Sequence, residues 1–223
     1  MSYPRLIIFD CDGVLVDSEV IDARIRSECF QAEGFPITVQ ELAEHSGISR
    51  AGLIELVQSR FGRPLPEGFM ETTRAKIMST FTDELRAIEG VSELLRSLAI
   101  PVCVASNSYP DRVRHALEVT GLWQFFDPHV FSAAMVKRGT PAPDLFLFAA
   151  NRLNVSPADC LVIEDSAHGT VAAQAAGMAV VGFCGGSHCS IGHAERLLGA
   201  GCMRVFAQMS ELGGFVRSLN PNQ

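Results

Sequence analysis

Polar side chains follow three short apolar runs of this sequence, LIIF, PVCVA and LVI. The residues that follow these runs are, in chain order, Asp10 and Asp12, Ser106 and Asn107, and Glu164 and Asp165. In an open parallel sheet, ligands bind beyond the carboxyl ends of the strands, so we expect these residues to lie together. Asp, Ser and Asn are also common helix N-caps. Three such groups at three strand ends nevertheless favour a ligand site.

Four carboxylates at one sheet edge repel one another unless a cation lies among them, and an all-oxygen set favours Mg²⁺. Asp10 and Asp12 are two residues apart across a turn, so one can attack a ligand while the other handles its proton. Attack on phosphorus gives an aspartyl-phosphate, and the metal neutralises phosphate charge. Backbone N–H groups at Ser106 and Asn107, ahead of a helix, would hold the remaining oxygens.

The elements that must position these residues are short strands alternating with helices. Continuous apolar runs, which suit strands covered on both faces, occur at 5–9, 100–105, 129–133, 160–164, 179–183 and 203–207. Helical patterns occur at roughly 91–99, 110–120, 144–153, 168–176 and 193–199. This alternation predicts an α/β fold, a doubly wound, Rossmann-like parallel sheet wrapped by helices.

One interval interrupts the alternation. Residues 17–86 show mostly helical patterns, punctuated by Gly-Phe-Pro at 34–36 and Gly-Arg-Pro at 62–64. We expect a helical insert after the first strand. The predicted domains are therefore an α/β core made of 1–16 and 87–223, and a helical domain made of 17–86.

Composition limits the partners and the compartment. The 223 residues are 48% hydrophobic, enough for a sizeable core, and the formal net charge is −7, which argues against nucleic acid and acidic membranes as partners. Seven scattered cysteines indicate reduced thiols in a cytoplasmic protein. The N-terminus lacks a signal-peptide pattern, and no apolar run is long enough to span a bilayer. We expect a monomer or weak homodimer.

The segments FDCDGVLVDSE, VASNS and VIEDSAHG, in this order, resemble the motifs of the haloacid dehalogenase superfamily. The resemblance covers nearly the whole chain. The insert is similar to the helical cap domain of the beta-phosphoglucomutase-like branch, which closes over the site and excludes water. The second aspartate and the acidic pair argue against the metal-free dehalogenase branch.

The resemblance implies a role for each site residue. Asp10 would be the nucleophile, and Asp12 the general acid/base that also gives its backbone carbonyl to Mg²⁺. Ser106 and Asn107 would bind the phosphoryl group. Glu164 and Asp165 would complete the metal site together with Asp10 and Asp12.

Between VASNS and VIEDSAHG, related sequences carry a further motif, Gly-Lys-Pro-x-Pro-Asp, where this chain has Thr140 in place of the lysine. Threonine donates a hydrogen bond but carries no charge. Three explanations stay open: Lys137 or Arg138 supplies the charge, the protein is slow or has a binding role, or the threonine was engineered. For Lys137 and Arg138 alone, solvated loop cations are the simpler interpretation.

The helical domain offers three candidate residues. The segment Gly47–Arg50 resembles the cap loop that contacts substrate, so Arg50 would pair with a carboxylate or second phosphate of the substrate. Lys76 is a similar candidate. Glu19 lies near the expected hinge between the two domains. Asp22 stands where beta-phosphoglucomutases carry a histidine, which lowers the case for a mutase.

The leading prediction is therefore a Mg²⁺-dependent phosphatase for a small phosphorylated sugar or sugar acid. One alternative is a phosphomutase, which would need a bisphosphate activator. Another is a low-activity phosphometabolite-binding protein, because Thr140 replaces the motif lysine.

A second candidate metal group is Cys184, His188, Cys189 and His193, which follow the fifth predicted strand. Zinc sites usually show tighter paired spacing than Cys-x4-Cys. A glycine-rich loop is the preferred interpretation of this segment.

Overall fold

The computed structural model describes residues 3–44 and 50–219. The chain divides into two compact units, one made of Met1–Asp17 and Arg86–Gln223, and the other of Ser18–Leu85. In the described ranges, no helix combines the length and the apolar character needed to cross a membrane.

The larger unit is built on a six-stranded sheet in the order β3-β2-β1-β4-β5-β6, with every neighbouring pair parallel. The strands are β1 (Leu6–Phe9), β2 (Val102–Ser106), β3 (Val130–Ser132), β4 (Cys160–Glu164), β5 (Ala179–Phe183) and β6 (Val205–Phe206). All four residues of β1 and all five of β4 are buried, as expected for apolar strands covered on both faces. The predicted fold class is confirmed.

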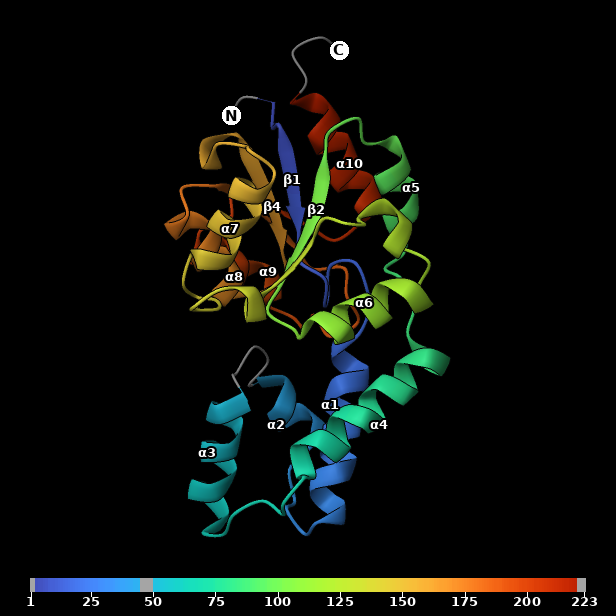
Figure 1. Ribbon diagram of the computed structural model, residues 1–223, viewed down its shortest axis with the longest axis vertical. Helices are drawn as coiled ribbons and strands as arrows, with labels where there is room; N and C mark the ends of the chain where they lie inside the picture. Colours follow the sequence, from blue (N-terminus) through green and yellow to red (C-terminus); the bar gives the residue numbers. More distant parts are fainter. Residues whose placement is uncertain (1–2, 45–49, 220–223) are drawn as a thin grey trace. The chain divides into compact units, whose positions relative to one another are not determined.

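Helices cover both faces of this sheet (Figure 1). The helices are α5 (Val91–Ser97), α6 (Pro110–Val119), α7 (Asp144–Arg152), α8 (Ala167–Ala175), α9 (His193–Ala200) and α10 (Met209–Ser218), with 3₁₀ turns at Trp123–Phe125, Ala133–Met135 and Pro157–Asp159. In Figure 1, α7, α8 and α9 lie on one side, and α5, α6 and α10 on the other. From β1 to β3 the chain adds strands on one side of β1, and from β4 to β6 it adds them on the other side. Because all crossovers have the same hand, the helices of the two halves lie on opposite faces of the sheet.

α10 is not among the helices predicted from the sequence. Its segment MSELGGFVRS contains two central glycines, which disfavour an isolated helix. Leu212 and Val216 are buried, and a Cβ on Gly213 would lie 3.1 Å from Leu94 Cδ1 of α5. Close packing against α5 therefore stabilises a helix that local propensity does not favour.

The smaller unit is helical, with α1 (Glu19–Ala32), α2 (Val39–Glu44), α3 (Arg50–Phe61) and α4 (Phe69–Glu84). No strand occurs in the described part of this unit. Its core is aromatic: the Phe30 ring centroid lies 4.8 Å from that of Phe69 and 6.4 Å from that of Phe35. Whether this unit acts as a cap domain stays a prediction.

Candidate active site

Three carboxylates meet where β1 and β4 end. One oxygen from each of Asp10, Glu164 and Asp165 lies within 4.8 Å of the other two. The parallel register pairs Phe9 with Ile163, so the residues after these two stand side by side, and the Asp10 N–H donates to the Ile163 carbonyl at 3.0 Å. Glu164 and Asp165 are only 3% and 6% exposed. The adjacent strand ends thus build the acidic cluster.

The cluster carries more negative charge than its surroundings compensate. Burial, followed by the charges of Glu164, Asp165 and Asp12, raises the pKa of Asp10 well above its usual value, against a 2.7 Å hydrogen bond from the Cys11 N–H. Burial and the charge of Asp165 raise the pKa of Glu164 to about 8, although Ser166 donates to this carboxylate. A cation among these oxygens would relieve both penalties, and an all-oxygen donor set fits Mg²⁺.

Two glycines let the backbone approach the cluster closely. A Cβ on Gly169 would lie 1.6 Å from Glu164 Oε1. A Cβ on Gly13 would lie 1.9 Å from Asp165 Oδ2, and Gly13 also has a φ of +77°, in the left-handed region that favours glycine. Any side chain at either position would displace a carboxylate of the cluster.

Asp12 points its carboxylate toward the start of α6. Its Oδ2 accepts a 2.6 Å hydrogen bond from Ser108 Oγ, and its Oδ1 lies 3.0 Å from a guanidinium nitrogen of Arg112. The Arg112 side chain is only 11% exposed, so this ion pair is shielded from water. The metal contact predicted for Asp12 involves its backbone carbonyl and stays a prediction.

Ser108 and Arg112 were missed as site residues. The signal for Ser108 is weak, because it is the third polar residue of the run SNS. Arg112 lies in the first turn of α6, whereas Ser108 precedes this helix, so no regular spacing in the sequence links the two residues. Cys11, between the two aspartates, is fully buried, as expected for a core residue.

The end of β2 and the β3–α7 loop come together beside Asn107. Ser106 is buried and its Oγ accepts from the Ser108 N–H at 3.1 Å, whereas Asn107 is exposed. A Cβ on Gly139 would lie 2.5 Å from Asn107 Oδ1. This contact places the loop that carries Thr140, a partly exposed residue, against the candidate phosphate-binding strand end.

The two cations of this loop differ in their surroundings. Arg138 forms a two-pronged ion pair with Asp144, at 2.8 and 3.1 Å, at the start of α7. Arg138 is thus engaged at the surface and is not directed at the carboxylate cluster. Lys137 is exposed. The role of Lys137 in phosphate binding stays a prediction.

The candidates of the helical unit lie on its helices. Glu19 begins α1, and Lys76 on α4 forms a 2.9 Å ion pair with Glu28 of α1. Residues 47–49 and the side chain of Arg50 lie outside the described part of the chain. Asp22 pairs with Arg26 one turn along α1. The Glu28 contact explains the position of Lys76 without a ligand, and all three candidate roles stay predictions.

Two histidines contact Asp165, one from the loop that follows β5 and one from the start of α9. His188 Nε2 lies 3.0 Å from Asp165 Oδ2, and His193 Nε2 lies 2.7 Å from the Asp165 carbonyl oxygen. Burial lowers the pKa of His188, but hydrogen bonds to Asp165 and Cys189 outweigh it and raise the pKa to about 10. Spacing in the sequence did not indicate that this loop reaches the acidic pair.

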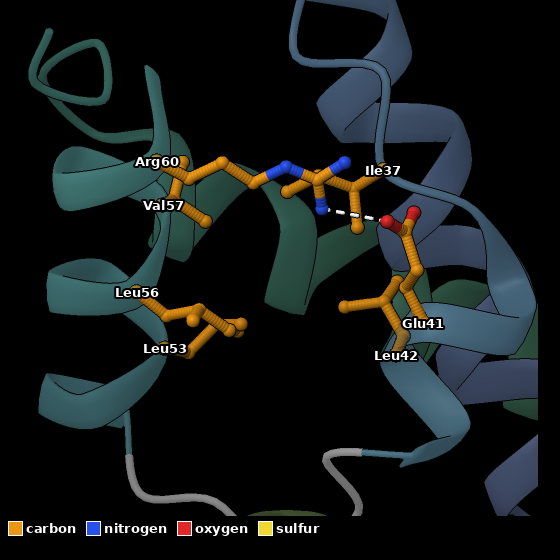
Figure 2. Close-up of a pocket in the computed structure, with 7 residues that line it drawn as sticks. All are labelled: Ile37, Glu41, Leu42, Leu53, Leu56, Val57 and Arg60. Atoms are coloured by element: carbon orange, nitrogen blue, oxygen red, sulfur yellow. Dashed lines mark hydrogen bonds and ion pairs between the residues drawn. The ribbon is translucent and has the colours of Figure 1, made fainter. Parts of the chain in front are cut away.

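The helical unit has a pocket of its own, of about 160 Å³, between α2 and α3 (Figure 2). Leucine, isoleucine and valine side chains from both sides face one another across it, and the Arg60–Glu41 ion pair, at 2.6 Å, crosses it. Arg60 is thus already paired with a carboxylate. The lining is otherwise apolar and does not suit a phosphate group.

The family model for haloacid dehalogenase-like hydrolases matches residues 4–177. The chain therefore belongs to this family of hydrolases, which confirms the resemblance of its three motifs. The sheet, the strand-end acidic residues and the order of the motifs agree with this assignment.

Individual relatives are similar over most of the chain. A 6-phosphogluconate phosphatase from Escherichia coli (strain K12) is 34% identical over 84% of this chain and 86% of its own length. A solved haloacid dehalogenase-like protein of unknown function from Agrobacterium tumefaciens is 38% identical, with a TM-score of 0.85 over 96% of this chain and 98% of its own. A hydrolase from Deinococcus radiodurans, solved with bound phosphate and sodium, is 30% identical, with a TM-score of 0.79 over 98% of this chain and 97% of its own.

Proposed function

We propose that this protein is a Mg²⁺-dependent phosphatase that hydrolyses a small phosphorylated sugar or sugar acid through an aspartyl-phosphate on Asp10. The observation that carries the proposal is the meeting of Asp10, Glu164 and Asp165 within 4.8 Å, beside an Asp12 whose carboxylate turns toward α6. Two carboxylates two residues apart thus have different surroundings. Such a division suits one nucleophile and one acid/base group.

In the first step, a carboxylate oxygen of Asp10 attacks phosphorus. The Cys11 N–H holds Oδ1 of Asp10 at 2.7 Å, which fixes the orientation of the carboxylate. Asp12 gives a proton to the leaving oxygen as the ester P–O bond breaks. Bound among Asp10, Glu164, Asp165 and the Asp12 carbonyl, Mg²⁺ would neutralise phosphate charge.

In the second step, Asp12 takes a proton from water as the water attacks phosphorus. The bond between Asp10 and phosphorus breaks, inorganic phosphate leaves, and both carboxylates return to their starting state. Ser106, Asn107 and Thr140 would bind the phosphoryl oxygens, with Lys137 as the nearby cation. This sequence is acid–base and covalent catalysis by two neighbouring carboxylates.

The substrate class comes from the relatives. One is named a 6-phosphogluconate phosphatase, and another, from Thermotoga maritima, is named a phosphorylated carbohydrates phosphatase. We extend this class to the present chain as part of the proposal. Residues 17–86 would act as its cap, with Arg50, Glu19 and Lys76 as substrate-side or hinge residues.

Thr140 favours a second candidate function, a phosphometabolite-binding protein with little turnover. Nothing charged stands at the position of the motif lysine. Such a protein would bind sugar phosphates in the presence of Mg²⁺ without releasing phosphate.

The direct test is phosphate release from a panel of sugar phosphates and sugar-acid phosphates, with and without Mg²⁺. We expect Mg²⁺-dependent release from at least one of them without any bisphosphate activator. Mg²⁺-dependent binding with no release would support the second candidate instead. A requirement for a bisphosphate would point to a phosphomutase.

Arg112→Met tests whether the ion pair to Asp12 matters for catalysis. Because the guanidinium holds the Asp12 carboxylate at 3.0 Å, we expect kcat to fall by about 10- to 100-fold, part of the contribution of general acid–base catalysis. Arg114→Met is the matched control, since Arg114 lies on the same helix and pairs with Glu118 at the surface. Equal kcat values for the two variants would show that the ion pair between Arg112 and Asp12 does not contribute to catalysis.

Mg²⁺ should stabilise the fold more at high pH than at low pH. The pKa of Glu164 is raised from 4.5 to about 8 by burial and by Asp165, so between these values the native state binds more protons than the unfolded state. The free energy of unfolding then falls as pH rises through this window without metal. Mg²⁺ binds the ionised carboxylates and restores the free energy of unfolding that is lost at high pH.

The measurement is the shift in Tm caused by Mg²⁺ at about pH 5.5 and about pH 8.5, for the wild type and Glu164→Gln. We expect a larger shift at the higher pH in the wild type, and a smaller shift in the variant. A shift that is the same at both pH values would argue against metal binding by this cluster.

A further inference from the structure

The loop between β5 and α9, together with the first residue of α9, brings together three side chains that bind soft metal ions. One donor atom from each of His188, Cys189 and His193 lies within 4.8 Å of the other two. These nitrogen and sulfur donors differ in kind from the oxygen donors of Asp10, Glu164 and Asp165. Thiolate and imidazole together favour Zn²⁺ over Mg²⁺.

The spacing of these atoms is close to that of ligands around one zinc ion. Because Nε2 of His188 lies against Asp165, the nitrogen left for a metal is Nδ1, which lies 4.0 Å from Cys189 Sγ. Zn–S and Zn–N bonds of about 2.3 and 2.0–2.1 Å place tetrahedral ligands roughly 3.3–3.7 Å apart. The rings of His188 and His193 are nearly perpendicular, with centroids 5.4 Å apart. Small side-chain shifts would complete the geometry.

Both rings already have the second contact typical of metal-bound histidines. Such histidines almost always give their other N–H to a carboxylate or a carbonyl. Here Asp165 supplies both acceptors, its Oδ2 for His188 and its backbone oxygen for His193. Because a carbonyl can only accept, His193 carries its proton on Nε2 and has a lone pair on Nδ1. In this structure Nδ1 accepts a 3.1 Å hydrogen bond from the exposed side chain of Arg196.

The fourth residue of this sequence cluster stands apart. Cys184 is not in the group of donors that the structure brings together in the described residues. The Cys-x4-Cys spacing therefore does not describe the group of donors that the structure brings together. The relevant pattern is His-Cys-x3-His, in which the loop fold, and not paired spacing, brings the donors together.

We propose that His188, Cys189 and His193 bind one Zn²⁺, or a divalent ion of similar softness, with a fourth position open to water. The ligands of this site are different residues from those of the carboxylate cluster, although both histidines contact Asp165 of that cluster. The proposal does not depend on phosphatase activity.

The test is the amount of Zn²⁺ retained after dialysis against buffer with excess Mg²⁺, which fills the oxygen site. The wild type and the matched control Cys184→Ser should each retain about one ion per chain, and Cys189→Ser and His193→Ala about none. Co²⁺ is the spectroscopic probe: a thiolate-to-metal charge-transfer band should appear in the wild type and Cys184→Ser, and be absent in Cys189→Ser.

Wild-type protein that retains no Zn²⁺ would overturn the proposal. So would Cys189→Ser that retains as much zinc as the wild type. Cys189→Ser changes a single atom, so it keeps the test decisive if His193→Ala does not fold. Because no substrate is used, the result is independent of the outcome of the phosphatase assay.

Discussion

Asp10→Asn should lower kcat/KM for phosphate release by at least about 10³-fold, as expected when a covalent nucleophile is lost. The amide has nearly the same shape as the carboxylate but does not attack phosphorus. It also removes one of the three charges that crowd this strand end. Asp159→Asn is the matched control, because Asp159 lies in the same unit and pairs only loosely with Arg5, at 3.9 Å.

The same variant has a second expected effect, on stability. Burial and the neighbouring carboxylates raise the pKa of Asp10, so its ionised form is costly in the native state without metal. We therefore expect Asp10→Asn to have a higher Tm than the wild type in the absence of Mg²⁺. Near-wild-type turnover in a well-folded Asp10→Asn protein would exclude Asp10 as the nucleophile.

Thr140→Lys should raise kcat/KM by about 10²- to 10³-fold, the size of the effect of one preorganised stabilising group. Of the two cations on this loop, Arg138 pairs with Asp144 at the surface and Lys137 is exposed, so neither is held in place beside the carboxylate cluster. The contact between Gly139 and Asn107 places residue 140 beside the strand end that would bind phosphate. An ammonium group there would stabilise the negative charge that develops during transfer.

Thr140→Met is the matched control, because it adds length without charge. Lys137→Ala completes the set. If the lysine variant gains nothing and Lys137→Ala loses activity, then Lys137 already supplies the charge. If Thr140→Met gains as much as Thr140→Lys, the effect is one of packing and the argument from charge fails.

The fold was largely predictable because the local sequence pattern indicates which strands are buried. LIIF is apolar throughout and CLVIE is apolar up to Glu164, and the structure buries every residue of both. Their polar successors then necessarily share one sheet edge. The meeting of Asp10 with Glu164 and Asp165 follows from this topology.

The contacts around the acidic residues were not predictable in the same way. Arg112 reaches Asp12 from α6, and His188 reaches Asp165 from the loop after β5. Each contact depends on the direction of a helix or loop in space, which no local pattern specifies. For the same reason, α10 forms by packing against α5 although its glycines disfavour a helix.

The central claim is that Asp10 carries the phosphoryl group during turnover. The most direct measurement is rapid acid quenching of the protein with a substrate from the panel and Mg²⁺, followed by peptide mass spectrometry. We predict an added phosphoryl group on the peptide that contains Asp10, and its loss after treatment with hydroxylamine, which cleaves acyl phosphates. Turnover with no phosphoryl group on that peptide, together with activity in Asp10→Asn, would contradict the account.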